Sequence, residues 1–219
     1  MTDKPVEILI RESLGEGGGW DPEQLGTIEA NDEIVKLRNK LETDPVTGLK
    51  NEHALGDMLL GLENAWRSDK KLNGFFVVAD LDNLHGVNRD YGEKDGGDGY
   101  LEDVAEVFIQ ASKMNRGRCF RNGTKSDMLV LYLSGQRNQA EIKGILDEMD
   151  HKLEELCDAR QIKWPGIKYG LSYCISRITE GRGPMTTFEA AANQMGAAKR
   201  PNPKDGRKGN VGRIFVRNE

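Results

Sequence analysis

The stretch from Phe75 to Leu101, FFVVADLDNLHGVNRDYGEKDGGDGYL, constrains the fold of this chain more than any other. It opens with the apolar run FFVVA, which has the length of a buried strand. Asp80 and Asp82 follow, and residues two apart on a strand point the same way, so both carboxylates are expected on one face. Asn88 and a glycine-dense loop ending in Asp98 come next. Such oxygen-rich groups suit a divalent metal and a nucleotide; a plain solvated turn is the alternative.

Helical and strand patterns alternate on both sides of this stretch. Apolar residues at helical spacing predict helices, and Asn-Gly at 122–123 predicts a hairpin turn between two short β runs. The predicted helices cover 29–41, 53–66, 100–114, 141–156 and 187–199, and the predicted strands lie near 75–79, 116–122, 126–135, 167–176 and 212–217. This order predicts an α/β fold, with a central sheet and helices on its faces.

Composition excludes several classes of protein. A chain of 219 residues is one medium domain with an extension. The net charge of −5, with 31% charged residues, argues against a broad nucleic-acid-binding surface. No apolar run is long enough to span a membrane, and no signal-peptide pattern opens the chain. The cysteines, Cys119, Cys157 and Cys174, have no metal or disulfide spacing, so we expect a cytoplasmic protein.

Three parts are expected along the chain. Residues 1–28 form a glycine-rich leader, residues 29–42 an amphipathic connecting helix, and residues 43–219 the main domain. The stripe Ile34, Leu37 and Leu41 marks the apolar face of the connecting helix. A helix that simply packs on its own domain shows the same stripe, so the stripe alone does not decide the oligomeric state.

Two strings in the sequence resemble the signature of the GGDEF family, the diguanylate cyclase domains. The first, ADLDNLHGVNRDYG with GGDGYL, is similar to the family pattern D-x-D-x-F-K-x-I-N-D-x-x-G-H-x-x-G-D-x-x-L, with one extra residue between Gly92 and Gly97. The second, TDPVTGLKN at 43–51, resembles the family's T-D-x-L-T-G-L-x-N opening, and Asn51 is expected to cap the helix that follows.

The resemblance implies a palm-like nucleotidyl cyclase fold, with a mostly antiparallel five-stranded sheet, and a site for GTP or another guanine nucleotide with Mg²⁺ or Mn²⁺. It implies partners as well, a second copy of the chain or another protein, and neither nucleic acid nor membrane. The implied metal ligands are Asp80, Leu81 and a hairpin acid. The residues implied to contact substrate are Leu84, His85 (in place of the usual lysine), Asn88, Asp98 and Lys199, the last toward phosphate.

The hairpin that gives the family its name is altered. The corresponding piece is RNGTKSDMLVLYLSG, without a GGDEF string, and two alignments fit it. Anchoring on Arg121 and Gly123 puts Ser126 at the metal position. Anchoring on the following strand puts Asp127 there, paired with Asp80, and Met128 where the next acid belongs. We prefer the second slightly. The family's R-x-x-D motif is absent upstream, so product inhibition is not expected.

Three functions remain open at this point. The first is a degenerate domain that binds guanine nucleotide with weak or lost cyclase activity, as a sensor or partner-binding module. The second is a working cyclase with a remodelled hairpin, using Asp80 and Asp127 to join two GTP molecules into a cyclic dinucleotide. The third is an interaction domain that binds no nucleotide. We rank them in this order.

Overall fold

The computed structural model describes residues 28–69, 71–123, 127–199 and 212–216. The leader expected at 1–28 therefore lies outside the described residues, apart from its last one. The chain divides into two units, residues 1–41 and 42–219. The first unit contains most of helix α2 (Ile28–Glu42), where the sequence predicts the connecting helix.

The second unit is built on one mixed sheet of five strands in the order β2-β3-β1-β4-β5. Three of the neighbouring pairs are antiparallel, and β4 with β5 is parallel, so the predicted fold class is confirmed. The strands are β1 (Gly74–Leu81), β2 (Gly117–Arg121), β3 (Met128–Ser134), β4 (Leu171–Arg177) and β5 (Arg213–Phe215).

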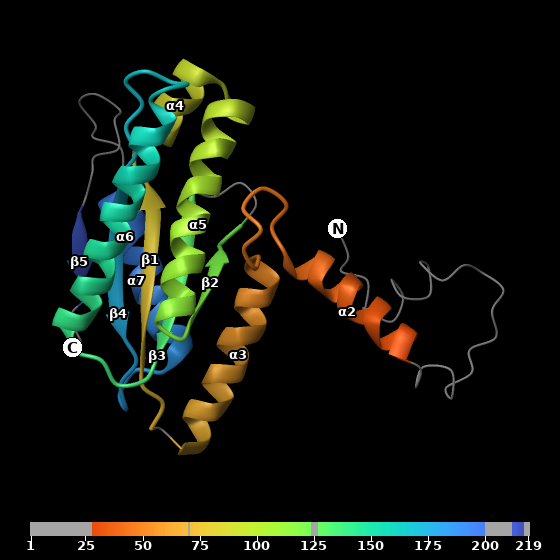
Figure 1. Ribbon diagram of the computed structural model, residues 1–219. Helices are drawn as coiled ribbons and strands as arrows, with labels where there is room; N and C mark the ends of the chain where they lie inside the picture. Colours follow the sequence, from red (N-terminus) through yellow and green to blue (C-terminus); the bar gives the residue numbers. More distant parts are fainter. Residues whose placement is uncertain (1–27, 70, 124–126, 200–211, 217–219) are drawn as a thin grey trace. The chain divides into compact units, whose positions relative to one another are not determined.

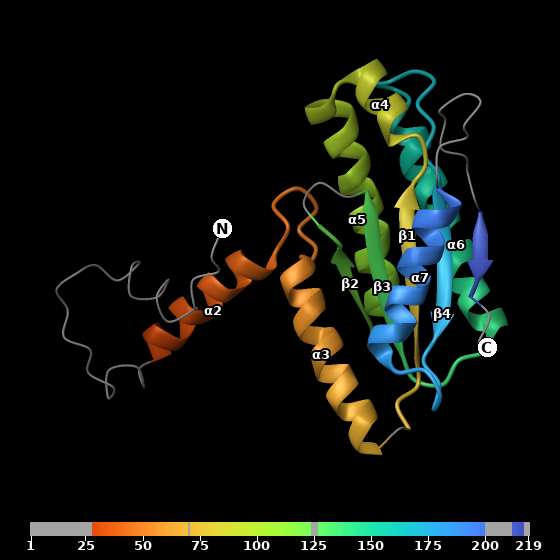
Figure 2. The same ribbon diagram turned by 180° about the vertical axis from the view of Figure 1, so that it is seen from behind.

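Helices cover both faces of the sheet (Figure 1, Figure 2). Those of the second unit are α3 (Glu52–Asp69), α4 (Leu84–Tyr91), the π-helical turn η2 (Glu93–Gly97), α5 (Asp98–Met114), α6 (Gln139–Arg160) and α7 (Pro184–Ala198). Asn51 caps α3 as expected: its Oδ1 accepts hydrogen bonds from the backbone N–H groups of His53 and Ala54.

Side-chain alternation along β1 divides the core. Phe75, Val77 and Ala79 pack with α5 and α6 on one face, whereas Phe76 and Val78 pack with α3 and α7 on the other. These β1 residues are almost completely buried, because β1 is the central strand and helices cover both of its faces. The same alternation places Asp80 on the α7 face, where the strand leaves the core.

Gly74, at the start of β1, is closely surrounded. A Cβ there would stand 2.8 Å from Tyr132 Cε2 and 2.9 Å from the backbone oxygen of Leu133. We expect Gly74→Ala to lower the free energy of unfolding by about 1–3 kcal/mol, because a backbone atom cannot yield. Gly144→Ala is the control: Gly144 lies in α6 with open space around it, so its replacement should add about 0.5–1 kcal/mol. Equal effects of the two changes in urea denaturation would contradict this account.

Candidate functional site

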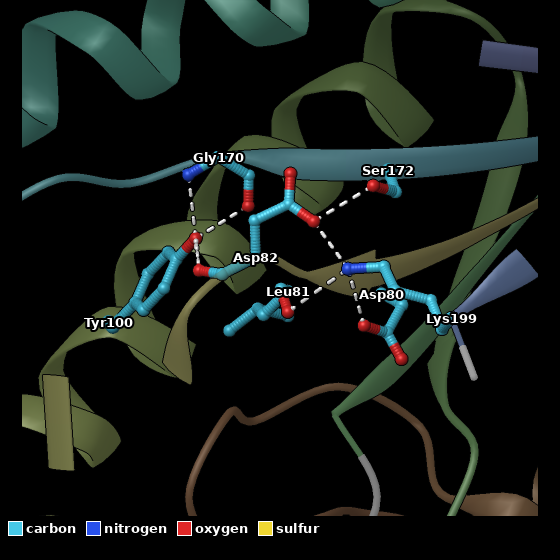
Figure 3. A network of polar contacts seen from close by, with 7 residues as sticks. All are labelled: Asp80, Leu81, Asp82, Tyr100, Gly170, Ser172 and Lys199. Atoms are coloured by element: carbon cyan, nitrogen blue, oxygen red, sulfur yellow. Dashed lines mark hydrogen bonds and ion pairs between the residues drawn. The ribbon is translucent and has the colours of Figure 1, made fainter. Parts of the chain in front are cut away.

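Asp80, Leu81 and Asp82 leave the C-terminal end of β1 and meet Lys199, which follows α7 (Figure 3). The Lys199 Nζ lies 2.8 Å from Asp80 Oδ1 and also contacts Asp82 Oδ1. It donates a longer hydrogen bond, 3.5 Å, to the carbonyl oxygen of Leu81. The Lys199 side chain is only 5% exposed, and those of Asp80 and Asp82 are 13% and 12% exposed. The two carboxylates and the ammonium therefore form a partly buried cluster of net charge −1.

Asp82 is fixed from several directions. Its Oδ1 accepts a hydrogen bond of 2.8 Å from the Ser172 hydroxyl, and its backbone N–H donates to the carbonyl oxygen of Gly170. Its other carboxylate oxygen, Oδ2, is buried and has no hydrogen-bond partner among the described residues. The sequence indicated that Asp80 and Asp82 share a face, but Ser172 was not recognised, because a serine within a strand carries no distinctive signal.

Tyr100, in the first turn of α5, joins the ends of β1 and β4. Its hydroxyl accepts a hydrogen bond of 2.7 Å from the N–H of Gly170. The same hydroxyl lies 2.5 Å from the carbonyl oxygen of Gly170 and 3.2 Å from that of Asp82 (Figure 3). Burial raises the pKa of Tyr100 far above its ordinary value, so the hydroxyl keeps its proton and can donate.

Removing this hydroxyl should weaken the fold. We expect Tyr100→Phe to lower the free energy of unfolding by about 1–3 kcal/mol, because the N–H of Gly170 loses its partner. Tyr132→Phe is the matched control, since the buried Tyr132 hydroxyl has no hydrogen bond acting on its pKa within the described part of the chain; its cost should stay below about 0.5 kcal/mol. Urea denaturation measures both, and an equal loss in the two variants would refute the bonding role of Tyr100.

Asn88 and Asp98 lie on either side of the π-helical turn η2. Asn88 is in α4, and its Oδ1 is buried without a hydrogen-bond partner among the residues described. That oxygen lies directly against Gly97: a Cβ on Gly97 would stand only 1.8 Å from it. Asp98, half-buried, opens α5 at the next position. The structure thus places the unpaired amide oxygen of Asn88 against Gly97, the residue that precedes Asp98.

The prediction of a glycine-dense loop before Asp98 is wrong in one respect, because residues 93–97 form a π-helical turn. The Gly97 N–H donates to the carbonyl oxygen of Gly92, five residues back. A π turn holds one residue more than the corresponding α turn, and such turns are frequent at functional sites. The extra residue between Gly92 and Gly97 is therefore accommodated within the helical path that leads to Asp98.

The hairpin brings a different residue opposite Asp80. The β1–β3 register pairs Asp80 with Met128, and directly paired residues of antiparallel strands share a face. Asp127 precedes β3, and its backbone carbonyl accepts a hydrogen bond of 3.3 Å from the N–H of Leu81. Ser126, the metal position in the first alignment, lies outside the described residues. The neighbour that faces Asp80 on the β3 side is thus a thioether, and the neighbour on the β4 side is Ser172.

Leu84 and His85 begin α4. Leu84 is buried in the core with the α5 residues, whereas the His85 side chain is exposed. Neither is part of the cluster around Lys199. Of the sequence-predicted residues, the structure brings together Asp80, Leu81 and Lys199 in one cluster and Asn88 and Asp98 at another corner.

The opening string TDPVTGLKN forms a buried polar network. Asp44 Oδ1 accepts hydrogen bonds from the backbone N–H and the hydroxyl of Thr47, at 2.8 and 2.7 Å. The Arg121 guanidinium contacts both Asp44 oxygens, at 3.0 and 3.2 Å. Burial favours a higher pKa for the Asp44 carboxyl, but the hydrogen bonds from Thr47 and Arg121 outweigh it and lower the pKa below its ordinary value. This string therefore ties the opening turn to the hairpin strand β2.

A known protein family matches most of this chain. The model of the family described as "Diguanylate cyclase, GGDEF domain" matches residues 41–204. The chain belongs to the GGDEF family. No curated protein matches it.

Solved structures of GGDEF domains resemble this chain in fold. The coiled-coil and GGDEF domain of DgcB from Caulobacter crescentus, in complex with c-di-GMP, is 18% identical, with a TM-score of 0.63 over 85% of this chain and 92% of that one. Diguanylate cyclase SiaD from Pseudomonas aeruginosa, in complex with its activator SiaC, is 20% identical, with a TM-score of 0.62 over 85% of this chain and 66% of that one. Vibrio cholerae LapD (S helix-GGDEF-EAL, apo) is 16% identical, with a TM-score of 0.58 over 86% and 40%.

GGDEF domains generally use a divalent metal ion, and the residues at the end of β1 decide whether one can bind here. Asp80, the Leu81 carbonyl and Asp82 supply oxygen donors of the kind that Mg²⁺ prefers. The centre of the donor set is taken by the Lys199 ammonium. The site as folded therefore fits an ammonium and does not fit a metal.

No helix in the described part of the chain is both long enough and apolar enough to cross a bilayer.

Proposed function

We propose that this chain is a regulatory GGDEF domain that binds guanine nucleotide in cyclic-dinucleotide signalling, with weak or lost diguanylate cyclase activity. The observation that carries the proposal is the position of Lys199, whose ammonium holds Asp80, Leu81 and Asp82. A cyclase needs a cation there that also binds the triphosphate, whereas this ammonium faces protein oxygens: it hydrogen-bonds Asp82 Oδ1 and the Leu81 carbonyl and forms an ion pair with Asp80. Met128 opposite Asp80 supports the same conclusion, because a thioether is a poor ligand for Mg²⁺.

Nucleotide binding is assigned to the corner of Asn88 and Asp98. The edge of guanine presents a ring N–H and an exocyclic amine, which need acceptors, and the buried Asn88 Oδ1 is an acceptor without a described partner. The carboxylate of Asp98 supplies a second acceptor at the next helical residue after Gly97. An unpaired buried acceptor costs stability, so a ligand that satisfies it gains affinity.

The test is to incubate the full chain with GTP and Mg²⁺ or Mn²⁺ and separate the nucleotides by chromatography. Binding of GTP is measured in parallel by calorimetry. We expect GTP to bind and to remain GTP. A cyclic dinucleotide formed at many turnovers and lost in Asp127→Ala would establish an active cyclase with a remodelled hairpin instead. Absence of both binding and product would leave an interaction domain that uses no nucleotide.

We expect this domain to act in signalling by binding a partner. SiaD shows a relative in complex with an activator protein, and we propose a partner of this kind, or a second copy of the chain, for the present domain. The three cysteines are free thiols, which accords with a cytoplasmic setting.

A further inference from the structure

Lys199 follows helix α7 directly and lies at the C-terminal end of β1. Ala191, Met195 and Lys199 are spaced four residues apart, so they follow one face of the helix and its cap. Ala191 and Met195 pack on Val78 and Cys174 of the sheet. Lys199, one turn beyond Met195, donates its backbone N–H to the Met195 carbonyl and caps the helix. A lysine at the end of an apolar stripe is thereby directed toward the sheet.

The ammonium is surrounded by protein oxygens. A lysine has three N–H donors, and three oxygens surround Nζ: Asp80 Oδ1, Asp82 Oδ1 and the Leu81 carbonyl. The Ser172 hydroxyl holds Asp82 Oδ1 in position, and the N–H of Asp82 is bonded to Gly170. The Asp82 carboxylate is therefore held by the end of β4 as well as by Lys199, whereas the Asp80 carboxylate contacts Lys199 (Figure 3).

We propose that Lys199 is the resident cation of this site and excludes a divalent metal from it. The point on which the three oxygens converge holds Nζ, and a metal ion would need the same oxygens at about 2.0–2.1 Å. With the Lys199 ammonium alone, the net charge of the cluster is −1. A divalent ion added beside the ammonium would make the net charge +1, in a site whose side chains are at most 13% exposed. Two cations cannot share these acceptors, because their repulsion is little screened where water is scarce.

Exclusion of metal is independent of whether nucleotide binds. Its consequence, that guanine nucleotide binds this chain equally well with and without divalent metal, rests on the proposed function. Failure of nucleotide binding would remove only this consequence, since metal binding is measured on the chain alone.

The test is an electron paramagnetic resonance titration of the full chain with Mn²⁺, without nucleotide. We expect the wild-type chain to bind Mn²⁺ only weakly, with an affinity unchanged by Asp80→Asn. Lys199→Met keeps the length and apolar stem of the side chain but removes the charge, and it should lower the Kd for Mn²⁺ by about 100-fold. That new site should disappear again in the Lys199→Met, Asp80→Asn double variant.

Two controls sharpen the result. Lys113→Met removes an exposed lysine from the last turn of α5 and should behave as the wild type. Lys199→Arg keeps a cation in place and should bind Mn²⁺ no better than the wild type. Tight Mn²⁺ binding by the wild-type chain that Asp80→Asn abolishes would overturn the proposal, even if no Lys199 variant folds. A folded Lys199→Met chain, verified by circular dichroism, that gains no Mn²⁺ site would overturn it as well.

Discussion

Arg121→Ala is expected to lower the free energy of unfolding by about 3–5 kcal/mol, because it leaves the Asp44 carboxylate buried without its counter-charge. Both partners are almost inaccessible: the Asp44 side chain is 2% exposed and that of Arg121 is 6% exposed. Thr47 supplies two hydrogen bonds to the carboxylate but no positive charge. Urea denaturation followed by circular dichroism measures the loss.

A double-variant cycle separates this ion pair from the cost of truncation. Asp44→Ala and Arg121→Ala should each be strongly destabilising, and the double variant should cost clearly less than their sum, because neither charge is then left alone. Arg89→Ala is the control: Arg89 pairs with Asp90 on the surface, and its removal should leave stability unchanged. Additive losses at 44 and 121 would show that the two residues act separately.

The same pair predicts a dependence on pH. The pKa of Asp44 is lowered in the folded chain, so its contribution is complete above the ordinary carboxyl pKa and is lost as the pH falls through the lowered value. The stability difference between the wild type and Asp44→Asn should therefore shrink on acidification from pH 6 to below the ordinary value of 3.8. A difference that stays constant over this range would contradict the lowered pKa.

Asn88→Ala is expected to weaken GTP binding by roughly 5- to 150-fold, the equivalent of losing a buried acceptor for one hydrogen bond from the base, about 1–3 kcal/mol. Gly97→Ala should have a similar effect although Asn88 itself is not replaced. The new methyl group would take the position of Asn88 Oδ1 and displace the amide. Discrimination of GTP from ATP should fall in both variants, since adenine presents a different pattern of donors. Calorimetric titration with each nucleotide gives the two affinities.

Gly61→Ala, in α3, is the control for these two variants, since open space surrounds Gly61. Its GTP affinity should equal that of the wild type. If Asn88→Ala and Gly97→Ala also bind GTP with wild-type affinity and selectivity, the base does not lie at this corner, and the nucleotide site must be sought elsewhere.

The sheet and its helices could be predicted from the sequence for a physical reason. β1 is buried on both faces and therefore reads as the continuous apolar run FFVVA, and each flanking helix shows an apolar face at helical spacing. Asp80 and Asp82 on one face follow from strand alternation alone. The cap by Asn51 is local chemistry, which the sequence displays directly.

Other parts of the site depend on contacts between distant segments. Tyr100 and Gly170 are 70 residues apart, and Lys199 and Asp82 are 117 apart, so no local pattern pairs them. The sequence predicted a loop where the π turn lies, because glycine adopts many backbone conformations and residues 93–97 show no apolar period. The spacing of Ala191, Met195 and Lys199 did contain a signal, because a lysine on the buried face of a helix requires an acidic partner.

The most direct measurement is a crystal structure of the full chain grown with GTP and Mn²⁺, with anomalous scattering recorded to locate the metal. The account predicts Lys199 Nζ between Asp80, Leu81 and Asp82, no anomalous peak among these three residues, and intact GTP. A manganese peak bonded to Asp80 and the Leu81 carbonyl, with Lys199 displaced toward the phosphates, would contradict it and restore the metal-dependent reading of the site.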